Sequence, residues 1–245
     1  MPKFFVRKDQ ISDGTITLLG DDAFHISRSL RMAKGEHITV SDMQGMEYEC
    51  ELTDFLSDSV CAQILSCRSA DNEPPKKIHL YQALPKGDKL DTVIQKAVEC
   101  GVFEIHPFES ERCVVKAKGD AEARKTERRN RIALEAAKQC GRSCIPKVYE
   151  SVNFRTAVQS ACEADLCIFC YEGESEQSLK TVLAKRGKNA ESISLIIGSE
   201  GGFSLSEAAL AKEAGALSVS LGKRILRTET AASFVLGCMV YEYEL

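Results

Sequence analysis

The hydrophobic residues follow two different patterns along the chain, and the change between them divides the sequence. Near the amino terminus, apolar and polar residues alternate as they do in half-buried strands, over residues 37–40, 48–52 and 60–65. A short helix is expected over residues 23–30, with Asp21 or Asp22 as its cap. The first part of the chain therefore reads as a small β-rich domain, residues 1–70.

From residue 78 onward, short aliphatic runs alternate with helical patterns. The runs typical of buried strands are residues 78–84, 102–107, 166–171, 193–197 and 216–221. Helices are expected between and after them, over residues 90–100, 122–140, 154–162, 176–185, 208–214 and 228–245. Such alternation predicts an α/β domain, residues 78–245, with a parallel sheet covered on both faces. A polar, proline-bearing stretch, residues 71–77, is the expected linker.

Two glycine-bearing turns follow the last two predicted strands directly, at residues 198–203 and 221–231. Between them, Ser204 and Glu207 fit a capping box, and Gly215 stands where the helix should end. In an open α/β sheet such turns lie at the carboxyl ends of the strands, where ligands bind. Two ordinary tight loops would leave the same pattern, since short glycine patterns are weak evidence. Neither turn matches a P-loop or a GxGxxG fingerprint, which disfavours a nucleotide triphosphatase or a dehydrogenase.

These turns also carry a resemblance. GSEGGFS at 198–204 followed by LGKRILRTETAA at 221–232 resembles the signature pair of the bacterial RNA (uracil-N3) methyltransferases, members of the SPOUT superfamily of knotted methyltransferases. Further segments stand in that family's order and spacing: SLRMAKGE at 29–36, KGDKLDTVIQKAVECGV at 86–102, Glu111-Arg112-Cys113 and EAAKQCGRSCIP at 135–146. The chain departs at Ser199, where the family usually has proline, and at Cys100, where leucine is usual.

The resemblance implies a fold and an activity. The expected fold is a C-terminal, trefoil-knotted, parallel-sheet domain preceded by a PUA-like β-barrel. The implied reaction is methylation of N3 of a uridine in 16S ribosomal RNA with S-adenosylmethionine, by a homodimer in the cytoplasm. Two alternatives remain open: an RNA-binding module without catalysis, and a related knotted enzyme acting on transfer RNA or on a ribose 2′-OH.

The resemblance also assigns a cofactor site at the two turns, with the adenine among Ile197, Leu221 and Leu226. The expected cofactor-binding residues are Ile197, Gly198, Glu200, Gly201, Gly202, Leu221, Gly222, Leu226, Thr228, Thr230 and Ala231. Within the segment 221–232, Thr228 is the expected cap of the closing helix, residues 228–245.

Methylation at uracil N3 requires removal of the N3 proton, which spreads negative charge over the ring. A fixed cation beside the ring should stabilise that charge. Arg227 is the first candidate, because it stays charged and directly follows the second glycine turn. Glu229 or Glu200 could accept the proton, although either could equally be structural, and Glu229 lies in the first turn of a helix where a carboxylate is stabilised anyway.

Charge is unevenly distributed along the chain. The formal net charge is −4, yet residues 112–142 hold ten Lys or Arg against four Asp or Glu. A local positive field of this kind suits phosphate contacts, and a solvated helix face would show the same excess. The candidate RNA contacts are Arg7, Arg28, Arg31, Arg112, Lys116, Arg128, Arg129 and Arg142.

The remaining composition narrows the class of protein. The chain is 44% hydrophobic and 28% charged, and we expect no membrane-spanning run and no signal peptide. Eleven cysteines scattered through predicted strands and helices indicate reduced thiols. Cys167 and Cys170 lie inside an apolar run without a nearby histidine, so no metal site is expected. The closing helix has an apolar face suited to the core, and Phe234 and Tyr241 on its other side are candidates for a subunit contact.

Overall fold

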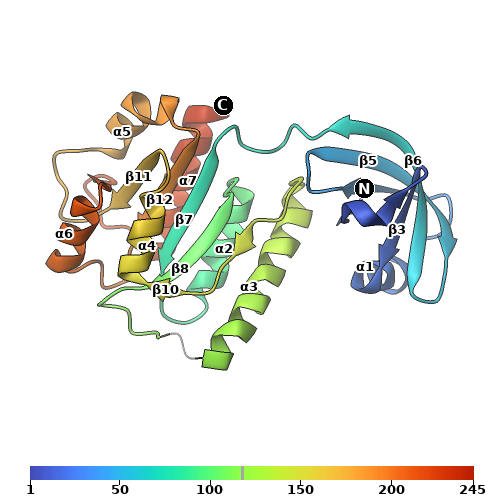
Figure 1. Cartoon of the computed structure of the whole chain (residues 1–245), viewed down its shortest axis with the longest axis horizontal. Helices are drawn as coiled ribbons and strands as arrows, with labels where there is room; N and C mark the ends of the chain where they lie inside the picture. The colour runs from blue at the N-terminus through green and yellow to red at the C-terminus, as the bar shows by residue number, and fades with distance from the viewer. Residues whose placement is uncertain (117–118) are drawn as a thin grey trace. The chain divides into compact units, whose positions relative to one another are not determined.

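The computed structural model describes residues 1–116 and 119–245, which group into two compact units. One unit comprises Met1–Glu73 with Ala137–Ile145, and the other comprises Pro74–Ala136 with Pro146–Leu245 (Figure 1). The sequence pattern placed residues 137–145 in the C-terminal domain. In the structure this short segment belongs instead to the N-terminal unit.

The N-terminal unit is built on one sheet with the strand order β1-β4-β5-β6-β3-β2. Its strands are β1 (Lys3–Phe5), β2 (Ile11–Ser12), β3 (Thr15–Leu19), β4 (His37–Ser41), β5 (Met46–Phe55) and β6 (Ser59–Ser69). β1 pairs with β4 in parallel, and the other pairs are antiparallel. The three predicted strands are confirmed as β4, β5 and β6. Their inward residues, such as Ile38, Leu52 and Val60, form one buried core.

The helical segment of this unit differs from the prediction. Helix α1 (Gly20–Phe24) starts earlier, and a wider π-helical turn over His25–Ser29 continues it. The residue at its amino end is Leu19, so Asp21 and Asp22 do not cap it but lie within its first turn. There the unpaired amide groups favour negative side chains. The predicted cap was therefore wrong by two or three positions.

Glu73 fixes the segment 137–145 within the N-terminal unit. Its carboxylate accepts hydrogen bonds from the backbone N–H of Ser143 at 2.8 Å and of Cys144 at 3.2 Å. The Nε of Arg142 donates to Glu73 Oε2 at 3.1 Å, and the Arg142 side chain is only 5% exposed. The Ser41 hydroxyl donates to the carbonyl of Ser143 at 2.6 Å. An ion pair and backbone hydrogen bonds thus hold a loop that is distant in sequence.

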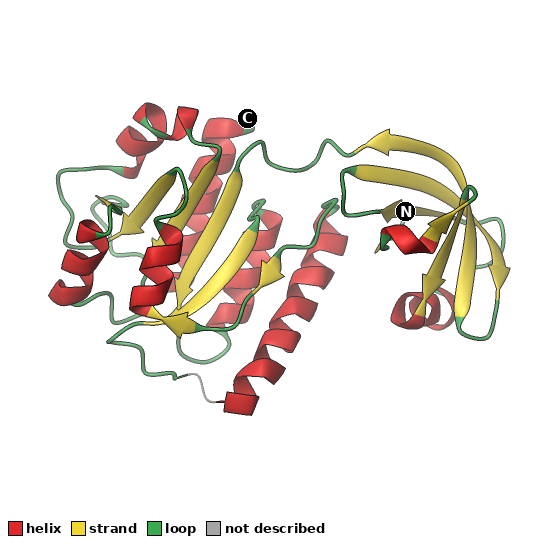
Figure 2. Cartoon of the chain, in the orientation of Figure 1, coloured by secondary structure: helices red, strands yellow, loops and turns green. Residues whose placement is uncertain are grey.

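The C-terminal unit contains a parallel sheet with the strand order β10-β8-β7-β12-β11-β13, and β9 pairs with β8 outside this path. Its strands are β7 (Lys77–Ala83), β8 (Glu104–Glu109), β9 (Lys147–Val148), β10 (Val152–Asn153), β11 (Leu166–Cys170), β12 (Ser192–Ile197) and β13 (Leu217–Val219). Helices cover both faces (Figure 2). They are α2 (Lys89–Glu99), α3 (Gly119–Cys140), α4 (Phe154–Ala161), α5 (Leu179–Lys185), α6 (Leu205–Glu213) and α7 (Thr228–Tyr243). This confirms the predicted α/β class.

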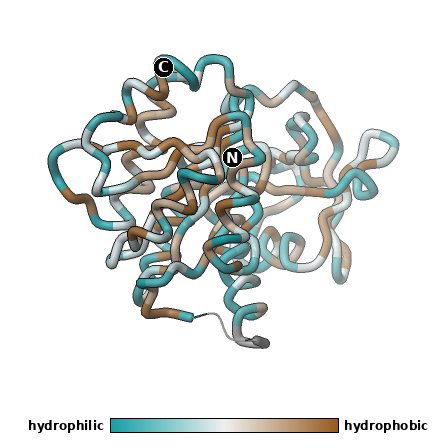
Figure 3. Tube along the Cα trace, turned by 60° about the vertical axis from the view of Figure 1, so that its left-hand side comes forward, coloured by the Kyte–Doolittle hydropathy of each residue, from teal (hydrophilic) through white to brown (hydrophobic). Residues whose placement is uncertain are grey.

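The central strands read as continuous apolar runs because both of their faces are buried. Every residue of β11 is buried, as are the last five of β12. The hydrophobic stretches of the trace gather in the interior strands, whereas the loops are mostly hydrophilic (Figure 3). This arrangement brings the carboxyl ends of β11, β12 and β13 to one edge of the sheet.

Two helix ends near that edge test the sequence pattern. The capping box of α6 is confirmed, since the Ser204 hydroxyl accepts from the Glu207 N–H and the Glu207 carboxylate accepts from the Ser204 N–H. Gly215 follows α6 with a φ of +99°. The cap of α7 was predicted wrongly, because Arg227 occupies the cap position and Thr228 is the first helical residue. The Thr228 hydroxyl is thereby free for contacts outside the helix.

Helix α7 buries one face and exposes the other. Ala232, Val235, Leu236 and Met239 are fully buried, as the core interpretation of its apolar stripe requires. Phe234 is 44% exposed on the opposite side. Of the basic residues between 112 and 142, Lys118 lies outside the described residues. No described helix combines the length and apolar character needed to cross a bilayer.

We expect Glu73→Gln to destabilise the N-terminal unit by about 2–4 kcal/mol, because it leaves the buried Arg142 guanidinium without a counter-charge. Burial alone would raise the pKa of Glu73, but the hydrogen bonds from Arg142 and Ser143 outweigh it and lower the pKa. The ion pair therefore stabilises the unit above about pH 4.3, the unfolded pKa, and this stabilisation is lost as the pH falls through the folded pKa. Urea unfolding at pH 7 and below 4 measures both effects.

The matched control is Asp54→Asn, which breaks the exposed Lys34–Asp54 pair of the same unit, with side chains 64% and 60% exposed. Solvent screens such pairs, so little change is expected. Equal losses in the two variants would contradict a structural role for Glu73.

Candidate active site

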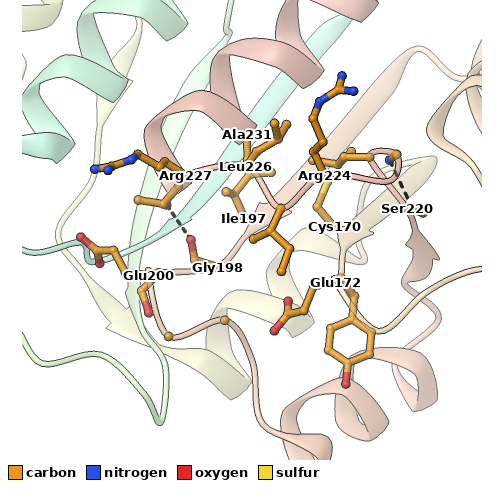
Figure 4. Close-up of a pocket in the computed structure, with 18 of the residues that line it drawn as sticks. Cys170, Glu172, Ile197, Gly198, Glu200, Ser220, Arg224, Leu226, Arg227 and Ala231 are labelled. Atoms are coloured by element: carbon orange, nitrogen blue, oxygen red, sulfur yellow. Dashed lines mark hydrogen bonds between the residues drawn. The ribbon is translucent and has the colours of Figure 1, made fainter.

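A cavity of about 540 Å³ lies at the carboxyl ends of β11, β12 and β13. Three turns that follow these strands surround it, residues 170–172, 197–202 and 220–228, together with Lys89 and Ala231. Ile197, Leu226 and Ala231 gather in the middle of the close-up, with Glu200 and Arg227 on one side and Glu172 on another (Figure 4). The cavity thus lies where ligands bind in open α/β sheets.

Two glycines of the first turn are required by their surroundings. Gly202 has a φ of +63°, and a β-carbon there would collide with the carboxylate of Glu172. A β-carbon on Gly201 would lie 2.9 Å from the β-carbon of Arg112. Side chains at these positions would therefore distort the turn. Ser199, between them and the strand, is buried, and its hydroxyl has no hydrogen-bond partner among the described residues.

The hydroxyl of Thr228 joins strand β7, the first glycine turn and helix α7. The Thr228 hydroxyl donates to the carbonyl of Gly198 at 2.6 Å and accepts from Nε2 of Gln82 on β7 at 2.9 Å. Gln82 is fully buried and Thr228 is 4% exposed. The Thr228 hydroxyl thus has both a donor and an acceptor as partners, whereas Oε1 of Gln82 is buried without a hydrogen bond among the described residues. The start of α7 is thus fixed against the turn that forms the opposite wall of the cavity.

Aromatic packing supports the same turn from below. Phe203 is 2% exposed, and its ring centroid lies 4.4 Å from that of Phe169 and 5.6 Å from that of Phe154. A β-carbon on Gly198 would come within 3.0 Å of the Phe203 ring. Because Gly198 has no side chain, the Phe203 ring can pack directly against the turn.

The two candidate carboxylates have different environments, because Lys89 lies closer to one of them. Lys89 Nζ donates to Glu200 Oε1 at 2.7 Å, and the backbone N–H of Lys86 donates to the same oxygen at 3.2 Å. Burial alone would raise the pKa of Glu200, but these hydrogen bonds outweigh it and lower the pKa. Glu229 Oε2 is 3.9 Å from Lys89 Nζ and is buried without a hydrogen bond among the described residues. Lys89 and the backbone therefore hold the Glu200 carboxylate more closely than that of Glu229.

Arg227 is exposed at the mouth of the cavity, and its side chain has no hydrogen bond or ion pair among the described residues. Its side chain extends away from Ile197 and Leu226 on the side where Glu200 lies (Figure 4). An unpaired guanidinium at the rim is free to approach a bound anion.

The structure brings most of the predicted cofactor-binding residues to the cavity wall. The predicted residues that line it are Ile197, Gly198, Glu200, Gly201, Gly202, Leu221, Gly222, Leu226, Thr228 and Ala231, together with Arg227. Thr230 does not line the cavity, because it projects from the exposed side of α7. Glu229 is outside the lining and is linked to it by Lys89.

The sequence interpretation missed Lys89 although it lies in the segment KGDK. A lysine at a helix start gave no reason to expect two carboxylates from residues 200 and 229. It also missed Arg224 and Lys223, which add positive charge to the wall.

The candidate RNA contacts divide into two groups. Arg129 and Arg142 are buried and paired with Glu122 and Glu73, so neither is available to phosphate, and these two predictions were wrong. The pattern of charges could not reveal this, because both arginines stand among exposed ones. The exposed candidates are Arg7, Arg28, Arg31, Arg112, Lys116 and Arg128. Of these, Arg112 donates to the carbonyl of Gly201 at 3.0 Å, and Arg128 pairs with Asp91.

Comparison with known proteins identifies the family. A family model described as an RNA methyltransferase domain matches residues 72–240. Ribosomal RNA small subunit methyltransferase E of Bacillus subtilis is 33% identical over 251 residues, covering 100% of this chain and 98% of the relative. The chain belongs to the ribosomal RNA small subunit methyltransferase E family.

Solved structures extend this similarity to the whole architecture. The methyltransferase E of Neisseria gonorrhoeae bound to S-adenosylmethionine has a TM-score of 0.88 and 31% identity, covering 99% of this chain and 98% of that one. A Legionella pneumophila protein in complex with S-adenosylmethionine has a TM-score of 0.86 at 31% identity, covering 98% of this chain and 96% of that one. Both of these similar structures thus contain S-adenosylmethionine.

We expect Thr228→Val to lower the free energy of unfolding of the C-terminal unit by about 1–3 kcal/mol. The valine has nearly the same shape but leaves the Gln82 amide and the Gly198 carbonyl buried without this partner. Thr228→Ser keeps the hydroxyl and should lose much less. Chemical denaturation followed by circular dichroism compares them, and equal losses would show that the methyl group, and not the hydrogen bonds, matters at this position.

Proposed function

We propose that this chain is an S-adenosylmethionine-dependent methyltransferase that methylates N3 of a uridine in 16S ribosomal RNA of the small subunit. The observation that carries the proposal is the cavity formed by three turns at the carboxyl ends of β11, β12 and β13. It occurs in a chain that aligns over nearly its whole length with cofactor-bound family structures.

The residues of the cavity suit this cofactor. A volume of about 540 Å³ is in the range of small-molecule sites, about 300–1,000 Å³. Ile197, Leu226 and Ala231 offer an apolar surface to an adenine ring, and the glycine turns expose main-chain groups to its edge. The carboxylate of Glu172 at the wall suits a positively charged ligand. S-adenosylmethionine, when bound, supplies the electrophilic methyl group.

The chain's own residues manage the proton and the charge of the uracil. Glu229 accepts the N3 proton, since Glu200 is engaged by Lys89 and by the backbone. The guanidinium of Arg227, which forms no hydrogen bond or ion pair with the described residues, then stabilises the negative charge on the uracil ring. Lys89, between the two carboxylates, keeps Glu200 ionised and in place.

The finer structural assignments belong to the same proposal. We infer that residues 1–70, together with the segment 137–145, form a PUA-like RNA-binding barrel, that residues 71–77 are a linker, and that the rest of residues 78–245 forms a SPOUT domain. Helix α7 returns from β13 at the sheet edge to pack against α2 and α5, and this return supports a trefoil knot.

A homodimer is part of the proposal as well. A groove of about 680 Å³ between α5 and α7 is lined by Leu179, Leu183, Phe234, Cys238 and Tyr241 among others. An apolar surface of this kind suits a second copy of the chain. We infer a cytoplasmic location as well, because that is where a protein acting on bacterial ribosomal RNA would meet its substrate.

We expect Arg227→Ala to lower single-turnover methyl transfer to 16S ribosomal RNA by about 10²–10³, comparable to the loss of one oxyanion donor. Cofactor affinity, measured by calorimetry, should change little, and Arg227→Lys should recover part of the rate. Glu229→Gln should lower the rate more than Glu200→Gln. Mass mapping of the methylated nucleoside identifies the target atom.

The matched control is Arg155→Ala, which removes an exposed arginine from α4 of the same unit. If Arg227→Ala abolishes cofactor binding, Arg227 belongs to the cofactor site instead. Methylation of transfer RNA or of a ribose 2′-OH would replace the proposed substrate, and cofactor binding without any transfer would favour an RNA-binding module.

RNA binding should depend on the exposed face of α3. Arg124, Arg128 and Arg131 share that face at helical spacing. The double variant Arg124→Glu, Arg131→Glu should weaken RNA binding and lower the slope of log K against log salt by about 0.7–0.9 per lost contact. Reversing Lys185 and Lys188, which gives the same net charge, is the control. Equal slopes for the wild type and both double variants would return α3 to the role of a solvated helix.

A further inference from the structure

Two histidines and a glutamate meet on one face of the sheet, near the amino ends of β7 and β8. His79 pairs in register with Glu104, and Tyr81 pairs with His106. Residues two positions apart on a strand point to the same face. His79, Glu104 and His106 therefore lie together, at the opposite ends of the strands from the turns that form the methyl-transfer cavity.

The polar atoms of the three side chains converge. Glu104 Oε1 is 2.7 Å from Nδ1 of His79 and 3.1 Å from Nε2 of His106. One potential ligand atom from each residue lies within 4.8 Å of the others. Four ligands at the zinc distances of about 2.0–2.2 Å stand roughly 3.3 Å apart in a tetrahedron. The observed separations thus need only small side-chain movements to accept an ion.

The neighbouring tyrosines fix the orientation of these groups. The His106 ring is stacked between Tyr81, at 4.5 Å between centroids, and Tyr149, at 4.4 Å. The Tyr149 hydroxyl donates to Glu104 Oε2 at 3.0 Å, which leaves Oε1 directed at the histidines. The Tyr81 hydroxyl is anchored in turn to Ser160 on α4 at 3.1 Å. Outer groups that orient ligands in this way are typical of protein metal sites.

We propose that His79, Glu104 and His106 form a binding site for one divalent transition-metal ion of the Zn²⁺ class. Two imidazoles and one carboxylate are the donor set that favours Zn²⁺ and its neighbours over Mg²⁺ or Ca²⁺. The side chains are 17%, 19% and 16% exposed, so an ion can enter and a water can complete the coordination. The ion would link β7 to β8 and, through Tyr149, to the chain after β9, separately from methyl transfer.

This site departs from the expectation of no metal. That expectation considered ligands close in sequence, whereas His79 is 25 residues from Glu104. The signal was the Glu-x-His pattern within a predicted strand, residues 102–107, which places both side chains on one face. Only the pairing of β7 with β8 adds the third ligand.

Titration of the chelator-treated full-length protein with Co²⁺ tests the proposal. Nitrogen and oxygen ligands give visible d–d bands, whereas thiolate ligands add a sulfur-to-cobalt band in the near ultraviolet. This distinction matters because the chain has eleven cysteines. We expect one equivalent to bind with the visible bands alone, to be displaced by Zn²⁺, and to raise the unfolding midpoint as the concentration of metal increases.

Variants identify the ligands. Tyr149→Phe keeps the ring stack but removes the hydroxyl that orients Glu104, and it should weaken Co²⁺ binding about tenfold. His106→Gln and His79→Gln should weaken it further. The matched control is His37→Gln, because His37 lies 3.5 Å from Glu49 with no third ligand among the described residues. Its affinity should equal that of the wild type.

Absence of the visible bands in the wild-type protein would overturn the proposal, whatever the variants do. A near-ultraviolet thiolate band, or equal affinity in His106→Gln and the wild type, would also overturn it. None of these outcomes bears on methyl transfer at the cavity.

Discussion

The arrangement of the cavity depends on the two hydrogen bonds of the Thr228 hydroxyl. This hydroxyl joins Gln82 of β7, Gly198 of the first glycine turn and the first residue of α7. These three segments are far apart in the sequence, and each forms a different wall or support of the site. Because the hydroxyl is buried and doubly hydrogen-bonded, it connects the turn directly to the start of the helix. The apolar wall of Ile197, Leu226 and Ala231 is positioned as a result.

The charged residues in and beside the cavity have unequal partners. Lys89 binds Glu200 closely and Glu229 at a greater distance, so the two carboxylates are chemically unequal. The inequality comes from where α2 begins relative to the two turns. The Arg227 side chain, which has no hydrogen bond or ion pair among the described residues, is the exposed positive charge at the cavity. The positions of the backbone thus give Lys89 a close contact with Glu200 and a longer one with Glu229.

Much of this could be predicted from sequence, because local patterns reflect local physics. The buried strands Ser192–Ile197 and Leu166–Cys170 were evident from their apolar runs, and Ser204 with Glu207 defined the start of α6. What failed depended on distant partners. Arg129 and Arg142 looked like their exposed neighbours until Glu122 and Glu73 paired with them. Threonine is a common helix cap, yet the Thr228 hydroxyl forms its hydrogen bonds with a strand and a turn that are distant in sequence.

The loop held by Glu73 has a consequence for how the protein is made. The N-terminal unit takes residues 137–145 from much later in the chain. During synthesis its sheet can form early, but the carboxylate of Glu73 must wait for Arg142 and Ser143 to leave the ribosome. Domains usually mature in order from the amino terminus. Here the first unit reaches its final form only after more than half of the chain has been translated, so its completion requires the synthesis of the intervening strands and helices.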